Sequence, residues 1–471
     1  MELYFGETDN NEIITLPLDT YLNKNIAVFG SSGSKKSRGF AIPNGIELVQ
    51  EELQSKMDRD TSLVFTDPKG ELYRKLAKYL ESKGYNVKVF NLVNPTYSHG
   101  AKFINFVEDE TDAQIFSQIV IEGTQLDSRS GGDEFWSRGE QNLLKALLLY
   151  VINYAKENDK NLGFMYDTLA SGNIKKIDRL FSETEGPTRL SYNIYAQATD
   201  IVKQSIVTGL ATRLQIFQTD KIRNITNKDE INFEKIGNEK TCIFVVTSDT
   251  NSAFDFLSTL FFSFLFIKLI KQADENQSGR LKVETSLILD EFTNIGRIVD
   301  FEKKLATTRS RGINIFMIFQ NIAQLKNRYD NDVWQEILGN ADTKICMGAG
   351  DIMTAEYLTK YLGVATVSTN AIRKEAGFDG KFTYGMENVS TNKRNLMNPD
   401  ELLKLDNNKE IVIVRGRKPF ICNKYDYSKH IEVEKLEDVT LEDQKEKFKD
   451  NVENEKNKKQ NKKVKYSFKD F

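Results

Sequence analysis

An apolar run that opens onto a glycine- and serine-rich loop constrains the fold of this chain more than any other feature. Residues 25–29 (NIAVF) have strand character and end at Gly30. The loop then reaches Lys36 and Ser37, and we expect a helix further on that includes residues 47–53. Small residues let a backbone wrap around an anion, and a helix that follows adds its positive N-terminal end. The segment therefore predicts a phosphate-binding loop of the Walker A kind.

Strand and helix signals alternate along much of the chain. Further runs with strand character lie at residues 62–66, 86–91, 241–246, 286–289, 313–319, 343–347 and 411–414. Helical patterns lie between some of them, at residues 72–83 and 257–270. This alternation predicts an α/β fold, a nucleotide-binding domain with a central, mostly parallel sheet covered by helices.

One long stretch departs from that alternation. Between residues 112 and 225 there is almost no strand signal, and apolar residues recur at helical spacing, as in Leu143, Leu144, Leu147, Leu148 and Val151. We therefore expect residues 1–111 and 226–432 to form the two parts of the nucleotide-binding domain and residues 112–225 to form an inserted all-α domain. Residues 433–471 are charged and poor in apolar side chains, which predicts a disordered tail.

A second part of a nucleotide site lies far from the loop in sequence. The apolar run at residues 286–289 is followed at once by Asp290 and Glu291, the Walker B arrangement. A buried strand delivers such acids at the carboxyl edge of a sheet, where α/β proteins bind ligands. We expect Lys36 to reach the β- and γ-phosphates of ATP, Ser37 and Asp290 to hold Mg²⁺, and Glu291 to polarise the attacking water.

Two further polar positions flank the strand at residues 313–319. A basic turn with Arg309 precedes it, and Gln320 ends it. The arginine could act as a finger on a neighbouring subunit's ATP, and the amide could sense the γ-phosphate; a surface charge and an ordinary polar strand end are the alternatives. The predicted catalytic residues are Glu291, Arg309 and Gln320, and the predicted nucleotide-binding residues are Gly30, Ser31, Ser32, Gly33, Ser34, Lys35, Lys36, Ser37 and Asp290.

Charge and composition limit how this chain could contact nucleic acid, bind zinc, form disulfides or enter a membrane. The formal net charge is −3, so any contact with nucleic acid would use local basic patches. Three scattered cysteines and two histidines indicate neither a zinc clip nor a disulfide scaffold. The most apolar stretch, residues 256–267, is bracketed by charges and short for a membrane span, so we expect a buried helix in a soluble chain with no signal peptide.

Taken in order, these segments resemble the TraG/TraD-type family of type IV secretion coupling proteins, relatives of the FtsK/HerA motors. The resemblance is carried by NIAVFGSSGSKKSRGFAIPN, TDPKGELYRKLAKYLESKGYNVKVFNL, LILDEFTNIG, TTRSRGINIFMIFQNIAQL and NADTKICMGAGDIMTAEYLTKYLG. A DPKGEL after the second strand of a P-loop domain is particularly specific. The resemblance assigns Arg309 to the trans-acting arginine, Gln320 to the strand-end glutamine that contacts phosphate, and the helical insertion to a domain that helps recognise substrate.

That family implies a RecA-like, ATP-driven pump for single-stranded DNA of any sequence. It implies a homo-hexamer at the cytoplasmic face of the membrane, with a relaxase or accessory factor of the relaxosome and the secretion channel proteins as partners. The chain departs from the family pattern in two respects. Lys35 stands where the motif has glycine, and we expect the family's N-terminal transmembrane region to be missing from this sequence, through truncation or through membership of a soluble subgroup.

Several alternatives stay open at this point. A substrate receptor or scaffold with weak or no hydrolysis would fit Lys35, and a FtsK/HerA-type translocase outside secretion would share the motor parts. The isolated chain could be a monomer. A lysine cluster near the end is expected to solubilise a disordered tail, with docking to DNA or a secretion substrate as the alternative; it comprises Lys456, Lys458, Lys459, Lys462, Lys463 and Lys465.

Overall fold

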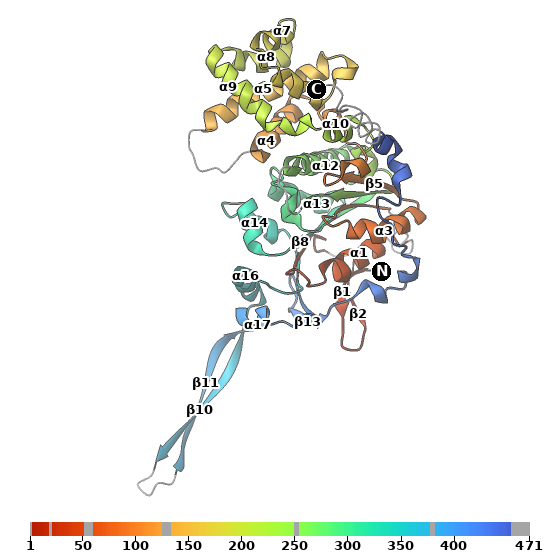
Figure 1. The fold of residues 1–471 in the computed structure, drawn as a ribbon. Helices are drawn as coiled ribbons and strands as arrows, with labels where there is room; N and C mark the ends of the chain where they lie inside the picture. Colours follow the sequence, from red (N-terminus) through yellow and green to blue (C-terminus); the bar gives the residue numbers. More distant parts are fainter. Residues whose placement is uncertain are drawn as a thin grey trace, which may run out of the picture.

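The computed structural model describes residues 2–17, 21–50, 60–124, 133–248, 254–376 and 382–453. Figure 1 shows a body built around a sheet, a group of helices beyond one end of it, and a long two-stranded ribbon that projects from the other end. The sheet body contains both of the segments from which the nucleotide site was predicted.

An eleven-stranded sheet forms the centre of the described chain, in the order β2-β1-β13-β12-β9-β3-β8-β7-β4-β6-β5. Neighbours from β9 to β5 in that order are parallel, whereas β12, β13, β1 and β2 add an antiparallel edge. The strands are β1 Glu2–Glu7, β2 Ile13–Pro17, β3 Ile26–Phe29, β4 Thr61–Thr66, β5 Asn86–Asn91, β6 Thr241–Val246, β7 Glu284–Leu289, β8 Ile313–Phe319, β9 Thr343–Cys346, β12 Lys409–Val414 and β13 Phe420–Asn423. The predicted α/β fold with a mostly parallel sheet is confirmed.

Each strand predicted from an apolar run lies in this sheet, with ends within two residues of the prediction. Most of these strands are largely apolar because both faces of the inner, parallel part of the sheet are covered. Ala27 and Phe29 of β3 belong to one hydrophobic cluster, and Ile26 and Val28 belong to the cluster on the other face. The sheet is therefore buried between two layers at the strand that leads into the phosphate loop.

The helix predicted to include residues 47–53 is wrong in position. Helical turns begin directly after the loop, with a π-helical segment Ser37–Ala41 and then α1 Ile42–Glu47, and residues 51–53 lie outside the described residues. Gly45 hid this helix, because a glycine in a helix interior lowers helix propensity. Gly45 packs closely: a Cβ there would meet Leu76 Cδ1 at 3.0 Å and Phe65 Cζ at 3.2 Å.

The group of helices seen at the top of Figure 1 comes from the stretch that lacked strand signals. Between residues 112 and 225 the described chain contains no strand, and the predicted apolar face of α5, which includes Leu143, Leu147 and Val151, is fully buried. The helices are α4 Glu110–Gly123, α5 Asp133–Asn153, α6 Leu162–Ala170, α7 Ile174–Phe181, α8 Gly186–Ala196, α9 Asp200–Arg213 and α10 Asp220–Asn227. The domain boundaries themselves remain a prediction.

The remaining helices cover the sheet or connect its strands. They are α3 Glu71–Ser82, α11 Phe233–Ile236, α12 Asp255–Glu275, α13 Phe301–Arg311, α14 Ile322–Arg328, α15 Val333–Gly339, α16 Ile352–Leu362 and α17 Pro399–Leu403. The ribbon is formed by β10 Val364–Ala376 and β11 Phe382–Asn395, which pair with each other in an antiparallel register.

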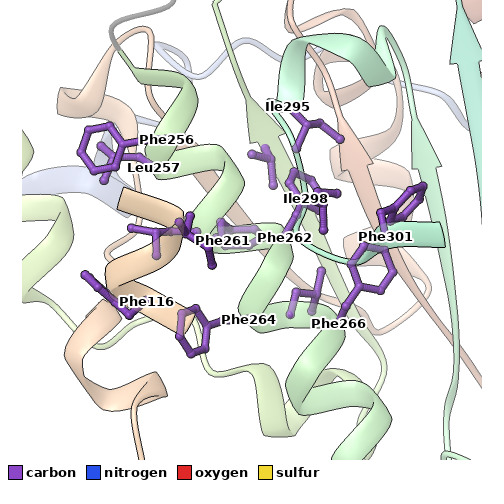
Figure 2. Packing of buried hydrophobic residues seen from close by; sticks show 14 of the residues in the cluster. Phe116, Phe256, Leu257, Phe261, Phe262, Phe264, Phe266, Ile295, Ile298 and Phe301 are labelled. Carbon is purple, nitrogen blue, oxygen red and sulfur yellow. The ribbon is translucent and has the colours of Figure 1, made fainter. Parts of the chain in front are cut away.

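Helix α12 forms the centre of one hydrophobic cluster. Figure 2 shows Phe264 beside Phe116 of α4, and Phe266 near Phe301 of α13. Among the described residues α12 is the one helix long and apolar enough to cross a membrane, but 72% of its most apolar 18-residue window is buried inside the protein. The helix is longer than the apolar run that predicted it, and the prediction of a buried helix agrees with this packing.

Residues 433–453 differ from the predicted disordered tail. Val439 and Phe448 are buried, the Tyr73 hydroxyl donates to Gln444 Oε1 at 2.7 Å, and Asn451 Nδ2 donates to Ser98 O at 2.9 Å. A few apolar side chains at wide spacing are enough to dock this charged segment on α3 and on the loop after β5. Residues 454–471, including the lysine cluster, lie outside the described residues.

Candidate nucleotide site

The carboxyl ends of three adjacent strands meet at one edge of the sheet. β3 leads into the phosphate loop, β8 ends before Gln320, and β7 ends before Asp290 and Glu291. β8 lies between β3 and β7 and pairs in parallel with both. The two segments that were predicted to form one site from distant parts of the sequence are thus one strand apart.

Backbone contacts with two neighbouring strands position the start of the phosphate loop. The Gly30 N–H donates to Phe319 O at 3.0 Å, and the Ser31 N–H donates to Gly348 O at 3.2 Å. A Cβ at Gly30 would meet Ser34 Oγ at 2.3 Å and Lys36 Cγ at 2.9 Å, so this position has no room for a side chain. Ser32 and Gly33 are exposed at the top of the loop, and Gly33 has a φ of +79°.

The side chain of Lys36 turns back over the loop. Its Nζ donates to Gly30 O at 2.7 Å and to Ser31 O at 3.2 Å. Burial lowers the pKa of Lys36, and the nearby carboxylates of Asp290 and Glu291 oppose that shift. The buried cation stands where phosphate oxygens could replace two carbonyl acceptors.

Ser37 and Asp290 are in direct contact. Ser37 Oγ donates to Asp290 Oδ2 at 3.2 Å, which joins the two halves of the predicted site. Burial raises the pKa of Asp290 to about 6, Lys36 acts against that shift, and Glu291 adds to it. Two neighbouring oxygen ligands of one Mg²⁺ are roughly 2.9 Å apart, given metal–oxygen distances of about 2.05 Å. The hydroxyl and the carboxylate therefore have the chemistry and the spacing for a shared Mg²⁺.

Gln320 holds the side chain of Glu291. Gln320 Nε2 lies 2.6 Å from Glu291 Oε1 and 2.7 Å from Glu291 Oε2. Glu291 has a φ of +53°, a left-handed conformation that is uncommon for a side chain of this size. A strained glutamate held by an amide at the sheet edge is typical of functional sites.

Asp67, in the DPKG segment, was not predicted as a site residue. It is 2% exposed, and its Oδ2 accepts the Tyr73 N–H at 2.8 Å at the start of α3. Burial raises the pKa of Asp67 to about 7, backbone donors oppose the shift, and Asp290 adds to it. Thr66 beside it donates through Oγ1 to Asp290 O at 2.6 Å. An acid directly after a buried strand was the signal that could have identified this neighbour of Asp290.

Lys35 occupies the position of the motif's glycine with a φ of +68°. Its Nζ donates to Asn408 Oδ1 at 2.9 Å, outside the loop. The side chain therefore points away from Lys36 instead of crowding the loop.

Arg309 is the predicted site residue that the structure does not bring to this edge. It lies on α13 and not in a turn, because the helix continues to Arg311 and ends at Gly312 with a φ of +75°. Gly312 O accepts the Thr285 N–H at the amino end of β7, so Arg309 lies near the opposite edge of the sheet. Arg309 is exposed, and Arg311 pairs with Asp274.

The family model described as "Type IV secretory system Conjugative DNA transfer" matches residues 4–466. The chain belongs to this family. Among curated relatives, Protein VirD4 of Rhizobium radiobacter is 21% identical over 376 residues, which is 78% of this chain and 53% of the relative. Conjugal transfer protein TraG of the same organism is 22% identical over 410 residues, which is 84% of this chain and 62% of the relative. The chain thus spans about half to three fifths of the length of these relatives.

Solved structures agree with the fold. The unbound bacterial conjugative coupling protein TrwB has a TM-score of 0.62 and 15% identity, with 85% of each chain covered. TrwB in complex with the ATP analogue ADPNP has a TM-score of 0.60 and 15% identity, with 86% of this chain and 85% of TrwB covered. A further TrwB structure contains ADP and Mg²⁺, with a TM-score of 0.57 and 15% identity, and covers 86% of each chain.

Proposed function

We propose that this chain is the ATP-driven coupling protein of a conjugative type IV secretion system. The observation that carries the proposal is the contact of Ser37 Oγ with Asp290 Oδ2, which joins the phosphate loop and the acidic strand end in one site. The TrwB complexes with ADPNP and with ADP and Mg²⁺ support nucleotide binding on this fold. The relaxase or accessory factor, the single-stranded DNA and the channel proteins are the partners that family membership suggests.

Each residue of the site has a proposed task. The loop from Gly30 to Ser37 surrounds the phosphates with N–H groups, and Lys36 exchanges its two carbonyl acceptors for phosphate oxygens. Ser37 and Asp290 would hold Mg²⁺, which would neutralise phosphate charge when bound. Glu291 orients or deprotonates the attacking water, and Gln320 must release it to do so.

Arg309 is proposed to act on the ATP of the next subunit in a homo-hexamer. Its place near the opposite edge of the sheet keeps it from its own site and leaves it exposed for a neighbour. Turnover would then change the contact between subunits, because ATP and ADP states differ in what Gln320 and Arg309 can bind. We place the ring at the cytoplasmic face of the membrane, with basic side chains that grip DNA without reading its sequence.

Glu291→Gln tests the catalytic part of the proposal. The variant should bind ATP with Mg²⁺ as tightly as the wild type and lose at least about a hundredfold in turnover, because an amide cannot accept the proton. Equilibrium titration and phosphate release measure the two quantities, and Glu302→Gln, at a half-buried position on α13, is a matched control. Normal turnover by Glu291→Gln would reject the assigned role.

A receptor or scaffold with weak or no hydrolysis is the second candidate, and the left-handed Lys35 favours it. A lysine at this conformation is less stable than a glycine by roughly 1–2 kcal/mol. The discriminating measurement is ATPase activity with and without DNA, for the wild type and for Lys35→Gly. A silent wild type beside a strongly active Lys35→Gly would support the scaffold.

A further inference from the structure

Three side chains from outside the phosphate loop hold its outer side. We call Asn407, Asn408 and Lys424 the loop clamp. Asn407 and Asn408 precede β12, and Lys424 directly follows β13, so the clamp belongs to the antiparallel edge of the sheet. The sequence offered no signal for it, because two asparagines in a turn and one lysine after a strand are common surface residues.

Lys424 is the buried member of the clamp, with an exposed fraction of 7%. Its Nζ donates to Ser34 O at 2.9 Å and to Met347 O at 2.5 Å, and it lies 3.4 Å from Asn407 Oδ1. Three acceptors match the three donors of an ammonium group. Burial lowers the pKa of Lys424 to about 8, and Glu410 opposes that shift. The geometry is that of a built contact between a buried cation and the loop.

The direction of the Ser34 carbonyl fixes the direction of the Lys35 N–H, because both groups belong to one peptide. In a trans peptide the C=O and the next N–H point in opposite directions, and the described chain has no cis peptide bond. Because Lys424 Nζ binds Ser34 O, the N–H of Lys35 points away from Lys424. A phosphate loop binds its anion through backbone N–H groups.

The same peptide explains why Lys35 is strained. With the Ser34 peptide fixed in this orientation, residue 35 has a φ of +68°, which a glycine adopts without cost and a lysine does not. Asn408 holds the Lys35 ammonium at 2.9 Å, and Asn407 Nδ2 lies 3.5 Å from Gly33 O. The clamp thus contacts the loop at three successive residues, around the place where the glycine is missing.

We propose that Lys424 is a positioning residue for nucleotide binding. It holds the Ser34–Lys35 peptide so that the N–H of Lys35 faces the phosphates. In this way it keeps the loop in the conformation that a glycine at position 35 would adopt without strain. The proposal rests on the proposed function, since it assumes that the loop binds a nucleotide.

A double-mutant cycle on the full chain tests the proposal. The four proteins are the wild type, Lys424→Met, Lys35→Gly and the double variant, and the measurement is the affinity for ATP with Mg²⁺ by calorimetric titration. Loss of a hydrogen bond from a charged group predicts an affinity about ten to a hundred times weaker for Lys424→Met. In the Lys35→Gly background the same substitution should weaken binding by less than about threefold, because glycine holds the loop conformation without help.

A purely structural role for Lys424 predicts a different result. If the lysine only joins β13 to β9, the loss is equal in both backgrounds, and an equal loss or no loss would overturn the proposal. Lys418→Met, at an exposed position in the turn between β12 and β13, is the control and should bind ATP as the wild type does. If Lys424→Met does not fold, Lys424→Gln serves in the same cycle.

Whether the wild type binds ATP shows which idea has failed, the positioning role of Lys424 or the proposed function. A wild type that binds ATP while the cycle shows no coupling overturns the role of Lys424 alone. A wild type and a Lys35→Gly variant that both fail to bind ATP overturn the nucleotide site and the positioning role together.

Discussion

The carboxyl groups of Asp290 and Glu291 lie close to the buried Lys36, and that of Asp67 lies close to Asp290. Burial raises the pKa of Asp290 to about 6 and that of Asp67 to about 7, and it lowers the pKa of Lys36. Each shift disfavours the charged form, so the site holds acids that are easily protonated until a cation enters. Mg²⁺ binding would displace that proton, because carboxylate ligands must be ionised.

This charge arrangement predicts how nucleotide affinity depends on pH. Below pH 6 a growing fraction of Asp290 is protonated, so the affinity for ATP with Mg²⁺ should fall by up to about tenfold per pH unit. Titrations at pH 5 and 7.5 measure the change. Asp290→Asn should bind weakly at both values and show a smaller ratio between them; an equal ratio would assign the pH dependence to the nucleotide and not to Asp290.

His99 predicts a separate pH effect, on folding. Its Nδ1 accepts the Val89 N–H at 3.0 Å, and burial together with Lys88 lowers the pKa of His99 to about 3. Protonation therefore favours the unfolded chain, where the pKa is about 6.5, and the stabilisation is lost as pH falls from 6.5 toward 3. His99→Asn keeps an acceptor without titrating. Chemical denaturation at pH 7 and 4.5 should show a smaller loss of unfolding free energy for His99→Asn, and parallel losses would contradict the assignment.

At the scale of elements, a substitution in α12 best tests how tightly the hydrophobic core is packed. Phe264 is fully buried and lies 6.1 Å from the ring of Phe116 and 6.2 Å from that of Phe106. Phe264→Ala should lower the free energy of unfolding by about 3–5 kcal/mol, since it removes a large side chain from a closed cluster. Glu275→Ala, at the exposed end of the same helix, should change it by less than about 0.5 kcal/mol. A small effect of Phe264→Ala would mean that this region is loosely packed.

The elements also show what the sequence could and could not predict. Strands buried on both faces, such as β4 and β8, appear as continuous apolar runs and were located within two residues. β1, β2 and β13 were missed because none of these strands has an apolar run longer than three residues. The ribbon of β10 and β11 was missed because it is rich in serine, threonine and asparagine, and pairs only with itself among the described strands.

The sequence also predicted some features of the candidate nucleotide site and not others. The phosphate loop, Asp290 and Glu291 follow sequence motifs whose spacing encodes chemistry, so these residues could be proposed before their contacts were known. The contacts of Gln320 with Glu291 and of Lys424 with Ser34 join residues that are 29 and 390 positions apart. No local pattern encodes such a pairing, because it depends on the order of the strands in the sheet.

For the whole molecule, the position of Arg309 bears on the proposed homo-hexamer. β8 has seven residues, and at about 3.3 Å per residue it separates Arg309 from Gln320 by roughly 20 Å. That distance exceeds the reach of an arginine side chain, so the chain cannot complete its own site with this residue. A head-to-tail ring, in which one subunit's Arg309 faces the next subunit's phosphate loop, would bring the two edges together.

Mixing two inactive variants tests this arrangement. Glu291→Gln and Arg309→Ala should each turn over ATP slowly, because each leaves every site without one group. In an equal mixture of exchanging subunits, roughly a quarter of the interfaces combine an intact Glu291 with an intact Arg309 from the neighbour. Phosphate release by the mixture should therefore recover to about a quarter of the wild-type rate, under conditions where sedimentation shows oligomers. Arg311→Ala, on the same helix as Arg309, removes the ion pair with Asp274 of α12 and should keep turnover by itself. A mixture no more active than its two components would place the arginine finger elsewhere, since subunits that share sites at their interfaces must complement each other.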